Sequence, residues 1–258
     1  MNLNHILDVA VSAAEKAAEI ILIALETPRV ADFKGKTDLV TKTDRDADQI
    51  IRKFIRAEFP DHGILAEESG SSLPHADFQW IIDPLDGTTN FVHGFPSFAV
   101  SIALHYKNEP MIGCIIELPV KHVYTAIKDQ GAFCNGEKIS VSKTDDLNQS
   151  LLVTGFGYKH GDLWKRNMKL FKHFTDITQG VRRLGAAAVD LCHVASGKVD
   201  GFWEFDLHPW DTAAGILIVK EAGGMITNMD GSTYSIFNNE ILATNGLIHQ
   251  KMVDQLKD

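Results

Sequence analysis

The sequence has few residues of the kinds that cross-link or interrupt a chain: three cysteines and eight prolines in 258 residues. Cys114, Cys134 and Cys192 are odd in number, widely spaced and outside any Cys-x-x-Cys arrangement. We therefore expect reduced, mostly buried thiols in a cytoplasmic protein. A catalytic thiol is the alternative, but no motif surrounds any of the three. With 45% hydrophobic and 23% charged residues, the composition excludes disorder, collagen and a coiled coil.

Long apolar runs are also missing. The longest covers the six residues 20–25, whereas a membrane-spanning helix needs roughly 20. Asp8 precedes the first Lys or Arg, so the N-terminal segment does not resemble the positively charged start of a secretory signal. We expect no membrane association.

Basic residues are fewer than acidic ones. There are 25 Lys and Arg against 34 Asp and Glu, a formal net charge of −9, which argues against direct binding of a nucleic-acid backbone. Residues 38–86 hold 11 acids and five bases, and residues 200–211 hold four acids and no Lys or Arg. The surplus is therefore concentrated in two stretches.

The first part of the chain is predicted to contain two amphipathic helices and an antiparallel meander. Apolar side chains recur at helical spacing in residues 3–25 and again in residues 44–58. Closely spaced strand-like runs occur at residues 64–66, 79–82, 98–105, 111–117 and 122–127.

From residue 150 strands and helices alternate, which is typical of an α/β arrangement. Strands are predicted at 151–154, 181–184, 201–204 and 241–243, and helices at 162–174, 186–196, 209–222 and 247–256. No repeat or flexible linker is visible. We therefore expect a mixed α+β and α/β fold in one unit over residues 1–258, with an N-terminal half of about 1–149 and a C-terminal half of about 150–258.

One strand ends in closely spaced carboxylates. Asp83 lies at the end of an apolar strand, Pro84 is expected to stop that strand, and Asp86 follows just before the small residues 87–89. If these small residues open a short helix, their backbone N–H groups would face an anion. Carboxylates beside an amide cradle suit Mg²⁺ bridging to phosphate. The alternative is an ordinary Asp-Pro and Asp-Gly turn.

Two further junctions carry acids. Glu67 and Glu68 follow the predicted strand 64–66, although adjacent glutamates are also common in solvated loops. Residues 204–211 hold several acids around Pro209, and a carboxylate in the first turn of a helix is the simpler explanation there.

Together these segments resemble the signatures of the inositol monophosphatase family. The resemblance lies in residues 67–69, 83–91 and 210–215. It extends from Lys34, Asp38 and Asp44 through 182–187 to 221–224. The 83–91 motif is highly specific, and the three segments occur in the expected order. The resemblance implies a layered αβαβα sandwich of the inositol monophosphatase and fructose bisphosphatase type, and a Mg²⁺-dependent, lithium-sensitive phosphomonoesterase that acts on inositol 1-phosphate.

The resemblance also implies a ligand set for two to three Mg²⁺ ions. Glu67, Asp83 and the Leu85 carbonyl would hold the first ion, and Asp83, Asp86 and Asp211 the second. A third, weaker ion would depend on Glu67 and water. Every side-chain ligand in this set comes from the two acidic stretches, so phosphate binding is expected to depend on metal.

Roles in catalysis and substrate binding follow from the same resemblance. Thr88, paired with Asp44 and close to Glu67, would orient and help deprotonate the attacking water, with no covalent enzyme intermediate. The Gly87 and Thr88 amides would hold the phosphate. The hydroxyls of the sugar alcohol would meet Asp86, Ala187, Glu204 and Asp211.

Several points leave alternatives open. Ala186 replaces a hydroxyl residue common in the family, which affects one polar substrate contact. Histidinol phosphate is a possible substrate because Glu204 would pair with an amine as readily as with hydroxyls. Other sugar phosphates are further alternatives, while bisphosphates and phosphoadenosine nucleotides fit a short acidic chain less well.

Three more expectations concern the surroundings of the site. The resemblance implies a homodimer. Arg182 and Arg183 are a solvated pair or, alternatively, a surface that binds a protein partner in a regulatory role. His93 is expected in the pocket wall rather than as a metal ligand, and Trp203 and Trp210 are expected in the core beneath the site.

Overall fold

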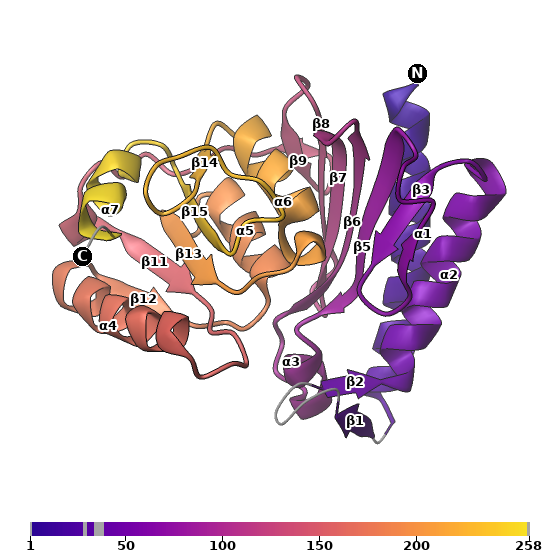
Figure 1. The fold of residues 1–258 in the computed structure, drawn as a ribbon, viewed down its shortest axis with the longest axis horizontal. Helices are drawn as coiled ribbons and strands as arrows, with labels where there is room; N and C mark the ends of the chain where they lie inside the picture. Colours follow the sequence, from indigo (N-terminus) through magenta and orange to yellow (C-terminus); the bar gives the residue numbers. More distant parts are fainter. Residues whose placement is uncertain (1, 28–29, 34–38, 257–258) are drawn as a thin grey trace.

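The computed structural model describes residues 2–27, 30–33 and 39–256. Lys34 and Asp38, which carry part of the family resemblance, lie outside the described residues. The chain forms five layers, helix, sheet, helix, sheet, helix, from right to left in Figure 1. The layered αβαβα sandwich expected from the sequence is confirmed.

The first layer consists of α1 (Leu3–Leu25) and α2 (Lys42–Glu58), which cover the outer face of the larger sheet. The helix α2 begins two residues earlier than the periodicity predicted. The Thr41 hydroxyl accepts the Asp44 N–H, and the Asp44 carboxylate accepts the Thr41 N–H at 2.8 Å, so the two residues form a capping box. A helix start is therefore fixed by its cap rather than by its first apolar residue.

The second layer is an eight-stranded sheet with the order β10-β9-β8-β7-β6-β5-β3-β4. Its strands are β3 (Gly63–Ala66), β4 (Gly70–Ser72), β5 (Phe78–Asp86), β6 (Phe98–Tyr106), β7 (Glu109–Leu118), β8 (His122–Ile127), β9 (Ala132–Cys134) and β10 (Glu137–Lys138). Neighbours from β5 to β8 pair antiparallel, so the predicted meander is confirmed for these four strands. It is wrong for β3, which pairs parallel with β5. A separate two-stranded sheet pairs β1 (Ala31–Phe33) with β2 (Leu39–Thr41), and α3 (Thr88–His93) follows β5.

The middle layer consists of α5 (Ala187–Ala195) and α6 (Pro209–Glu221), which lie between the two sheets. Eight successive residues of α6, Thr212–Val219, are buried, because this helix has a sheet on each side. The core around α5 and α6 contains residues from both halves of the chain, such as Ile81, Ile115 and Phe202.

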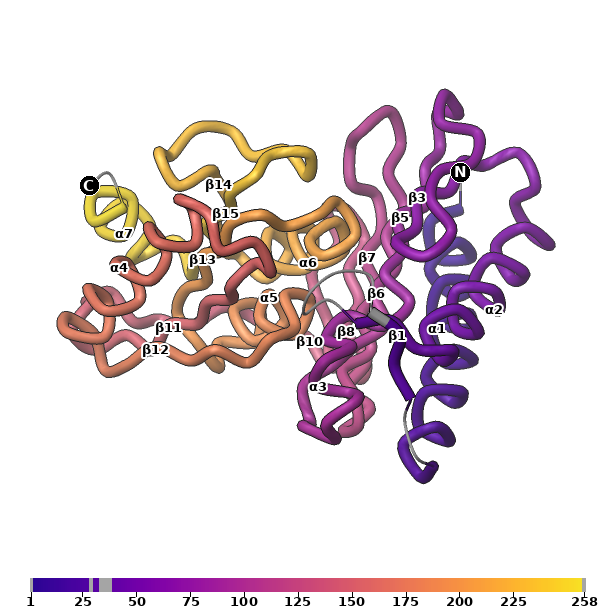
Figure 2. The backbone as a smooth tube through the Cα atoms, turned by 60° about the horizontal axis from the view of Figure 1, so that its bottom comes forward, coloured from indigo at the N-terminus to yellow at the C-terminus, as the bar shows by residue number. Residues whose placement is uncertain are grey.

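The remaining two layers come from the second half. A five-stranded sheet has the order β12-β11-β13-β15-β14, and its outer face packs against α4 and α7 (Figure 2). Its strands are β11 (Leu151–Thr154), β12 (Gly180–Arg182), β13 (Gly201–Phe205), β14 (Met225–Thr227) and β15 (Glu240–Thr244); the helices are α4 (Asp162–Ile177) and α7 (His249–Leu256), and η1 (Leu147–Gln149) precedes β11. None of the described helices combines the length and apolar character needed to cross a bilayer.

A charge cluster around the buried Glu117 joins β7 to the end of α5. The Glu117 carboxylate accepts from His193 Nε2 at 3.1 Å, His122 Nδ1 at 3.2 Å and the Tyr124 hydroxyl at 3.2 Å, with Lys198 Nζ at 3.6 Å. Burial alone would raise the pKa of Glu117, but the hydrogen bond and charge of His193, followed by the charge of Lys198, lower it to about 2. The cluster therefore holds the middle layer against the larger sheet.

Candidate active site

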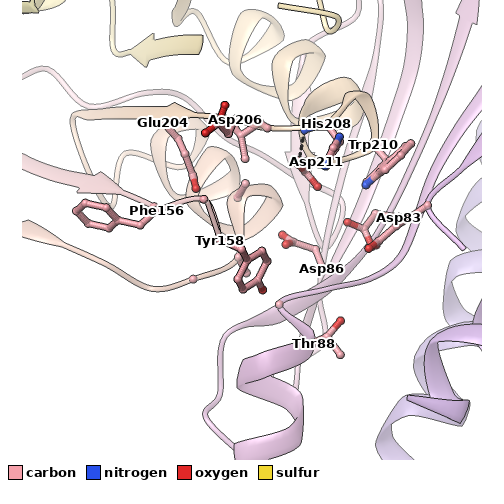
Figure 3. Close-up of a pocket in the computed structure, with 18 of the residues that line it drawn as sticks. Asp83, Asp86, Thr88, Phe156, Tyr158, Glu204, Asp206, His208, Trp210 and Asp211 are labelled. Carbon is pink, nitrogen blue, oxygen red and sulfur yellow. Dashed lines mark hydrogen bonds between the residues drawn. The ribbon is translucent and has the colours of Figure 1, made fainter. Parts of the chain in front are cut away.

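The site lies in a cleft of about 680 Å³ that is lined by residues of the larger sheet, of the middle-layer helices and of the five-stranded sheet with its loops (Figure 3). Most residues predicted from the sequence line it: Glu67, Asp83, Leu85, Asp86, Gly87, Thr88, Ala187, Glu204 and Asp211. Asp44 lies behind Thr88 and is only 1% exposed. The folded chain therefore brings together residues that are up to 167 positions apart in the sequence.

A bulge in β5 determines how Asp83 and Asp86 are presented. Pro84 was expected to end the strand, but β5 continues to Asp86 with a register shift, in which Asp83 pairs with Ser101 and Asp86 with Ala99. Proline has no backbone N–H to donate, and it is tolerated at this bulge because the irregular strand pairing does not require one there. Residues three apart in a regular strand point to opposite faces, and the extra residue of a bulge restores the same face. The bulge therefore accounts for both carboxylates lining one cleft.

The acids of the cleft repel one another. Burial raises the pKa of Asp83 well above its usual range, and repulsion from Glu67, Asp86 and Asp211 raises it further. Burial also raises the pKa of Asp86 to about 7, against the lowering effect of a hydrogen bond from Ala188. Such a cluster is unfavourable unless protons or cations reduce its charge.

Backbone N–H groups orient the same carboxylates. Asp83 Oδ1 accepts from the Leu85 N–H at 3.0 Å, and Asp86 Oδ2 accepts from the Ala188 N–H at 2.7 Å. Asp211 Oδ2 accepts from the His208 N–H at 2.6 Å, because Asp211 is the third residue of α6 and His208 is its cap. Each acid is therefore fixed by the local backbone of its own element or of α5.

The donor set suits hard divalent cations. In residues 39–256, no three His, Cys, Asp or Glu side chains are already arranged around one point as a complete metal site. The chemistry nevertheless fits, because Glu67, Asp83, Asp86 and Asp211 are oxygen donors whose mutual repulsion a cation would relieve. The charges of all three other acids raise the pKa of Asp83, which is itself fully buried.

Thr88 and Asp44 form the hydrogen bond that the resemblance implied. Thr88 Oγ1 donates to Asp44 Oδ1 at 2.8 Å, with the Leu85 carbonyl as an alternative acceptor at 3.1 Å. The other Asp44 oxygen is held by the N–H and hydroxyl of Thr41. The acid that starts α2 therefore also sets the orientation of a hydroxyl in the cleft.

Gly87 permits the turn between β5 and α3. Its φ is 84°, in the left-handed region, and a Cβ there would lie 2.9 Å from the Ser97 carbonyl oxygen and 3.1 Å from the Ala186 Cβ. No other residue fits this position without displacing backbone. Ala186 therefore packs against the turn.

The far side of the cleft is formed by β13 and the loop after β11. Glu204 is 7% exposed and accepts no hydrogen bond from any residue in the described part of the chain. A Cβ at Gly155 would lie 2.1 Å from Glu204 Oε1, so a glycine is required where the two segments meet. Asp190 in α5 is fully buried, and neither of its carboxylate oxygens has a partner among the described residues.

Sequence reasoning missed part of the wall. Phe156, Tyr158, Lys159 and Asn239 line the cleft but were not predicted, since none lies in a motif. The glycine pattern directly after the strand that ends at Thr154 was a signal for the first three. Asp206 also lines the cleft; it lies in the acidic stretch 204–211 but was assigned no role.

Two expected wall and core residues lie elsewhere. His93 is exposed at the end of α3 and does not line the cleft, because the short helix directs it outward. Trp203 is fully buried as predicted. Trp210, in contrast, is half-buried and lines the cleft, with its ring stacked on His208 at a centroid distance of 5.0 Å.

The arginine pair has two different environments. Arg182 and Arg183 are both exposed, but only Arg183 lines the cleft. Its charge lowers the pKa values of Asp190 and Glu204, although burial keeps both raised. Arg183 is therefore part of the cleft rim.

Comparison with known proteins agrees with this geometry. Residues 2–258 match the model of the inositol monophosphatase family. The chain is 48% identical to Phosphatase IMPL1, chloroplastic, of Arabidopsis thaliana, over 98% of this chain and 70% of that protein. It is 39% identical to the Nus factor SuhB of Salmonella typhimurium, over 99% and 97% of the two chains.

A solved structure gives the same result for the fold. The inositol monophosphatase from Anabaena superposes with a TM-score of 0.88 at 40% identity, covering 99% of this chain and 96% of that one. Sequence and fold agree along essentially the whole length, and the chain belongs to the inositol monophosphatase family.

Proposed function

We propose that the chain is a Mg²⁺-dependent, lithium-sensitive phosphatase that hydrolyses inositol 1-phosphate to inositol and phosphate by in-line attack of water. The observation that carries this proposal is the Thr88–Asp44 hydrogen bond beside four mutually repelling carboxylates. Acids that repel one another are costly to retain without a cation, and an oriented hydroxyl next to them suits activation of water.

The metal ligands are proposed as the resemblance implies them, for two to three ions. Glu67, Asp83 and the Leu85 carbonyl would hold one Mg²⁺, and Asp83, Asp86 and Asp211 would hold another. When bound, Mg²⁺ lowers the pKa of a water and neutralises charge on the phosphate. The burial of Asp83 beside three other acids, whose charges raise its pKa, supports this assignment because a cation would offset that repulsion.

The chain's own groups position the reactants. Thr88 donates its hydrogen to Asp44, so a lone pair of its oxygen is left to accept a hydrogen bond from the attacking water. Glu67 lines the same cleft and assists in taking the proton. The Gly87 and Thr88 amides hold the phosphate at the turn after β5.

Glu204 supports a polyol as the leaving group. Its buried carboxylate has no donor among the described residues, and a substrate hydroxyl would supply one. We propose that Asp86, Ala187 and Asp211 complete the contacts to the sugar alcohol. An amine would also satisfy Glu204, so histidinol phosphate is the substrate to compare.

The test is phosphate release from inositol 1-phosphate with Mg²⁺, with EDTA and with millimolar Li⁺, alongside histidinol phosphate. Asp83→Asn should lower kcat by at least about 100-fold, whereas Asp77→Asn, an exposed acid just before β5, should leave it unchanged. An Asp83→Asn variant as active as the parent would refute the metal assignment. A kcat/KM that is higher for histidinol phosphate than for inositol 1-phosphate would make histidinol phosphate the preferred substrate, with the proposed mechanism unchanged.

A regulatory role is the second candidate, because a relative over nearly the whole chain is named a Nus factor. Arg182 is the residue to test, since it is exposed and outside the cleft. If a protein partner binds there, Arg182→Glu should lose that partner while phosphate release continues. If Arg182→Glu co-purifies with the same proteins as the parent, the regulatory role at this surface is refuted.

Three further expectations stay proposals: a homodimer, a single folding unit over 1–258, and a cytoplasmic protein. The shared core around α5 and α6 supports the single unit. Light scattering would give the oligomeric state, and one cooperative unfolding transition seen by two probes would establish the unit.

A further inference from the structure

Asp206 has an unusual backbone conformation at the edge of the cleft. It directly follows β13, its φ is 60°, and its N–H donates to the Asn239 carbonyl at 2.8 Å. Glycine adopts the left-handed region without cost, whereas other residues enter it less often, with Asn and Asp the most frequent among them. A residue held in this conformation in the wall of a functional cleft calls for an explanation.

Asp206 and Glu204 lie on the side of the cleft opposite Asp83 and Thr88 (Figure 3). They are two residues apart, and no described residue donates a hydrogen bond to either carboxylate. Two glycines make room for them: a Cβ at Gly157 would lie 3.1 Å from the Asp206 Cβ, much as Gly155 accommodates Glu204. The loop and the strand end are therefore shaped around two acids.

Two positive side chains also line the cleft, and the charge of Arg183 acts on Glu204. Lys159 and Arg183 line the same cleft, and by themselves they would favour a leaving group with a second negative charge. A carboxylate at position 206 opposes that preference. Its charge is not needed to hold the strand, because the link to Asn239 is made by the backbone.

We propose that Asp206 is a specificity-determining residue that, together with Glu204, selects uncharged polyhydroxyl leaving groups and rejects leaving groups that carry a second anionic group. The carboxylates accept hydrogen bonds from hydroxyls and repel a carboxylate or a second phosphate. This inference rests on the proposed phosphatase function and names the substrate class of that site.

The test uses two phosphate monoesters that differ at one end only. Glucitol 6-phosphate ends in a hydroxymethyl group, and 6-phosphogluconate ends in a carboxylate. The wild-type protein should prefer glucitol 6-phosphate. In Asp206→Asn, which keeps the shape and tolerates the left-handed conformation, that preference in kcat/KM should fall by about three- to tenfold, mainly through KM for 6-phosphogluconate. Asp206→Gly should give the same change.

The matched control is Asp129→Gly. Asp129 has a φ of 62° but lies in the turn after β8, outside the cleft, so its replacement relieves the same backbone conformation and should leave the preference unchanged. An active wild-type protein whose preference is the same in both Asp206 variants would overturn this inference alone. A wild-type protein that releases phosphate from neither ester nor from inositol 1-phosphate would overturn the proposed function and this inference together.

Discussion

The Asp86 carboxylate of β5 accepts a hydrogen bond of 2.7 Å from the backbone N–H of Ala188 in α5, 102 positions away. One residue comes from the larger sheet and the other from the helix layer between the sheets. The cleft is therefore built where these two layers meet, and its acids depend on the packing of both.

The Thr88 hydroxyl should be needed for turnover. Thr88→Val keeps the branched shape but removes the oxygen that bonds to Asp44, and kcat should fall by about 100-fold or more with little change in KM. Thr88→Ser should retain most activity. The control is Thr89→Val, because Thr89 Oγ1 is buried and has no partner among the described residues. Equal kinetics for Thr88→Val and the parent would contradict the assignment.

Gly87 should be sensitive to any side chain. In Gly87→Ala the left-handed φ of 84° is strained and the new Cβ meets the Ser97 carbonyl at 2.9 Å, so the free energy of unfolding should fall by about 3 kcal/mol. Gly70→Ala is the matched control, since Gly70 has a φ of 70° and nothing within 4 Å, and it should lose only about 1 kcal/mol. Urea titrations measure both. Equal losses would show that the contact with Ser97 is unimportant.

Stability should depend on pH through Glu117. Its folded-state pKa is about 2, below the ordinary value of 4.5, so its contribution is fully present above about pH 4.5 and is lost as the pH falls toward 2. Glu117→Gln should therefore cost about 2 to 3 kcal/mol at pH 7 and less near pH 3. Denaturant unfolding of the parent and Glu117→Gln at pH 7 and near pH 3 tests this prediction. A difference in the free energy of unfolding that stays constant or grows at low pH would contradict it.

Removal of divalent cations should reverse the order of stability of the parent and Asp83→Asn. In EDTA, Asp83→Asn should be more stable than the parent by about 1 kcal/mol, because the substitution removes repulsion among buried acids. Mg²⁺ at 100 times its Kd should stabilise the parent by about 2.7 kcal/mol and the variant much less. Thermal unfolding with and without Mg²⁺ measures both. A parent insensitive to Mg²⁺ would argue against the proposed ligands.

Periodicity was sufficient for the main elements of the fold. Long amphipathic helices such as α1 and the apolar strands β6 to β8 were predicted close to their observed bounds, since each has a complete repeat of buried positions. The sequence analysis missed strands β1, β2, β4, β9, β10 and β14. Each has only two or three residues, which show no alternation and pair only through tertiary context.

The site residues were predicted from the family resemblance, and the reason for their geometry was not visible in the sequence. A proline after Asp83 is typical of a strand end, and only the pairing with β6 reveals a bulge that continues to Asp86. Tyr158 and Lys159 belong to no motif and reach the cleft through the position of β11 beside β13. Residues of this kind depend on contacts between distant segments.

Because the cleft acids come from both halves of the chain, activity depends on an intact backbone between those halves. Asp83 and Asp86 lie on β5, whereas Asp211 and the Ala188 N–H belong to helices of the second half. A nick anywhere in residues 139–146 would leave each fragment with an incomplete set of cleft acids. Activity would then require the two pieces to bind each other, as in fragment complementation.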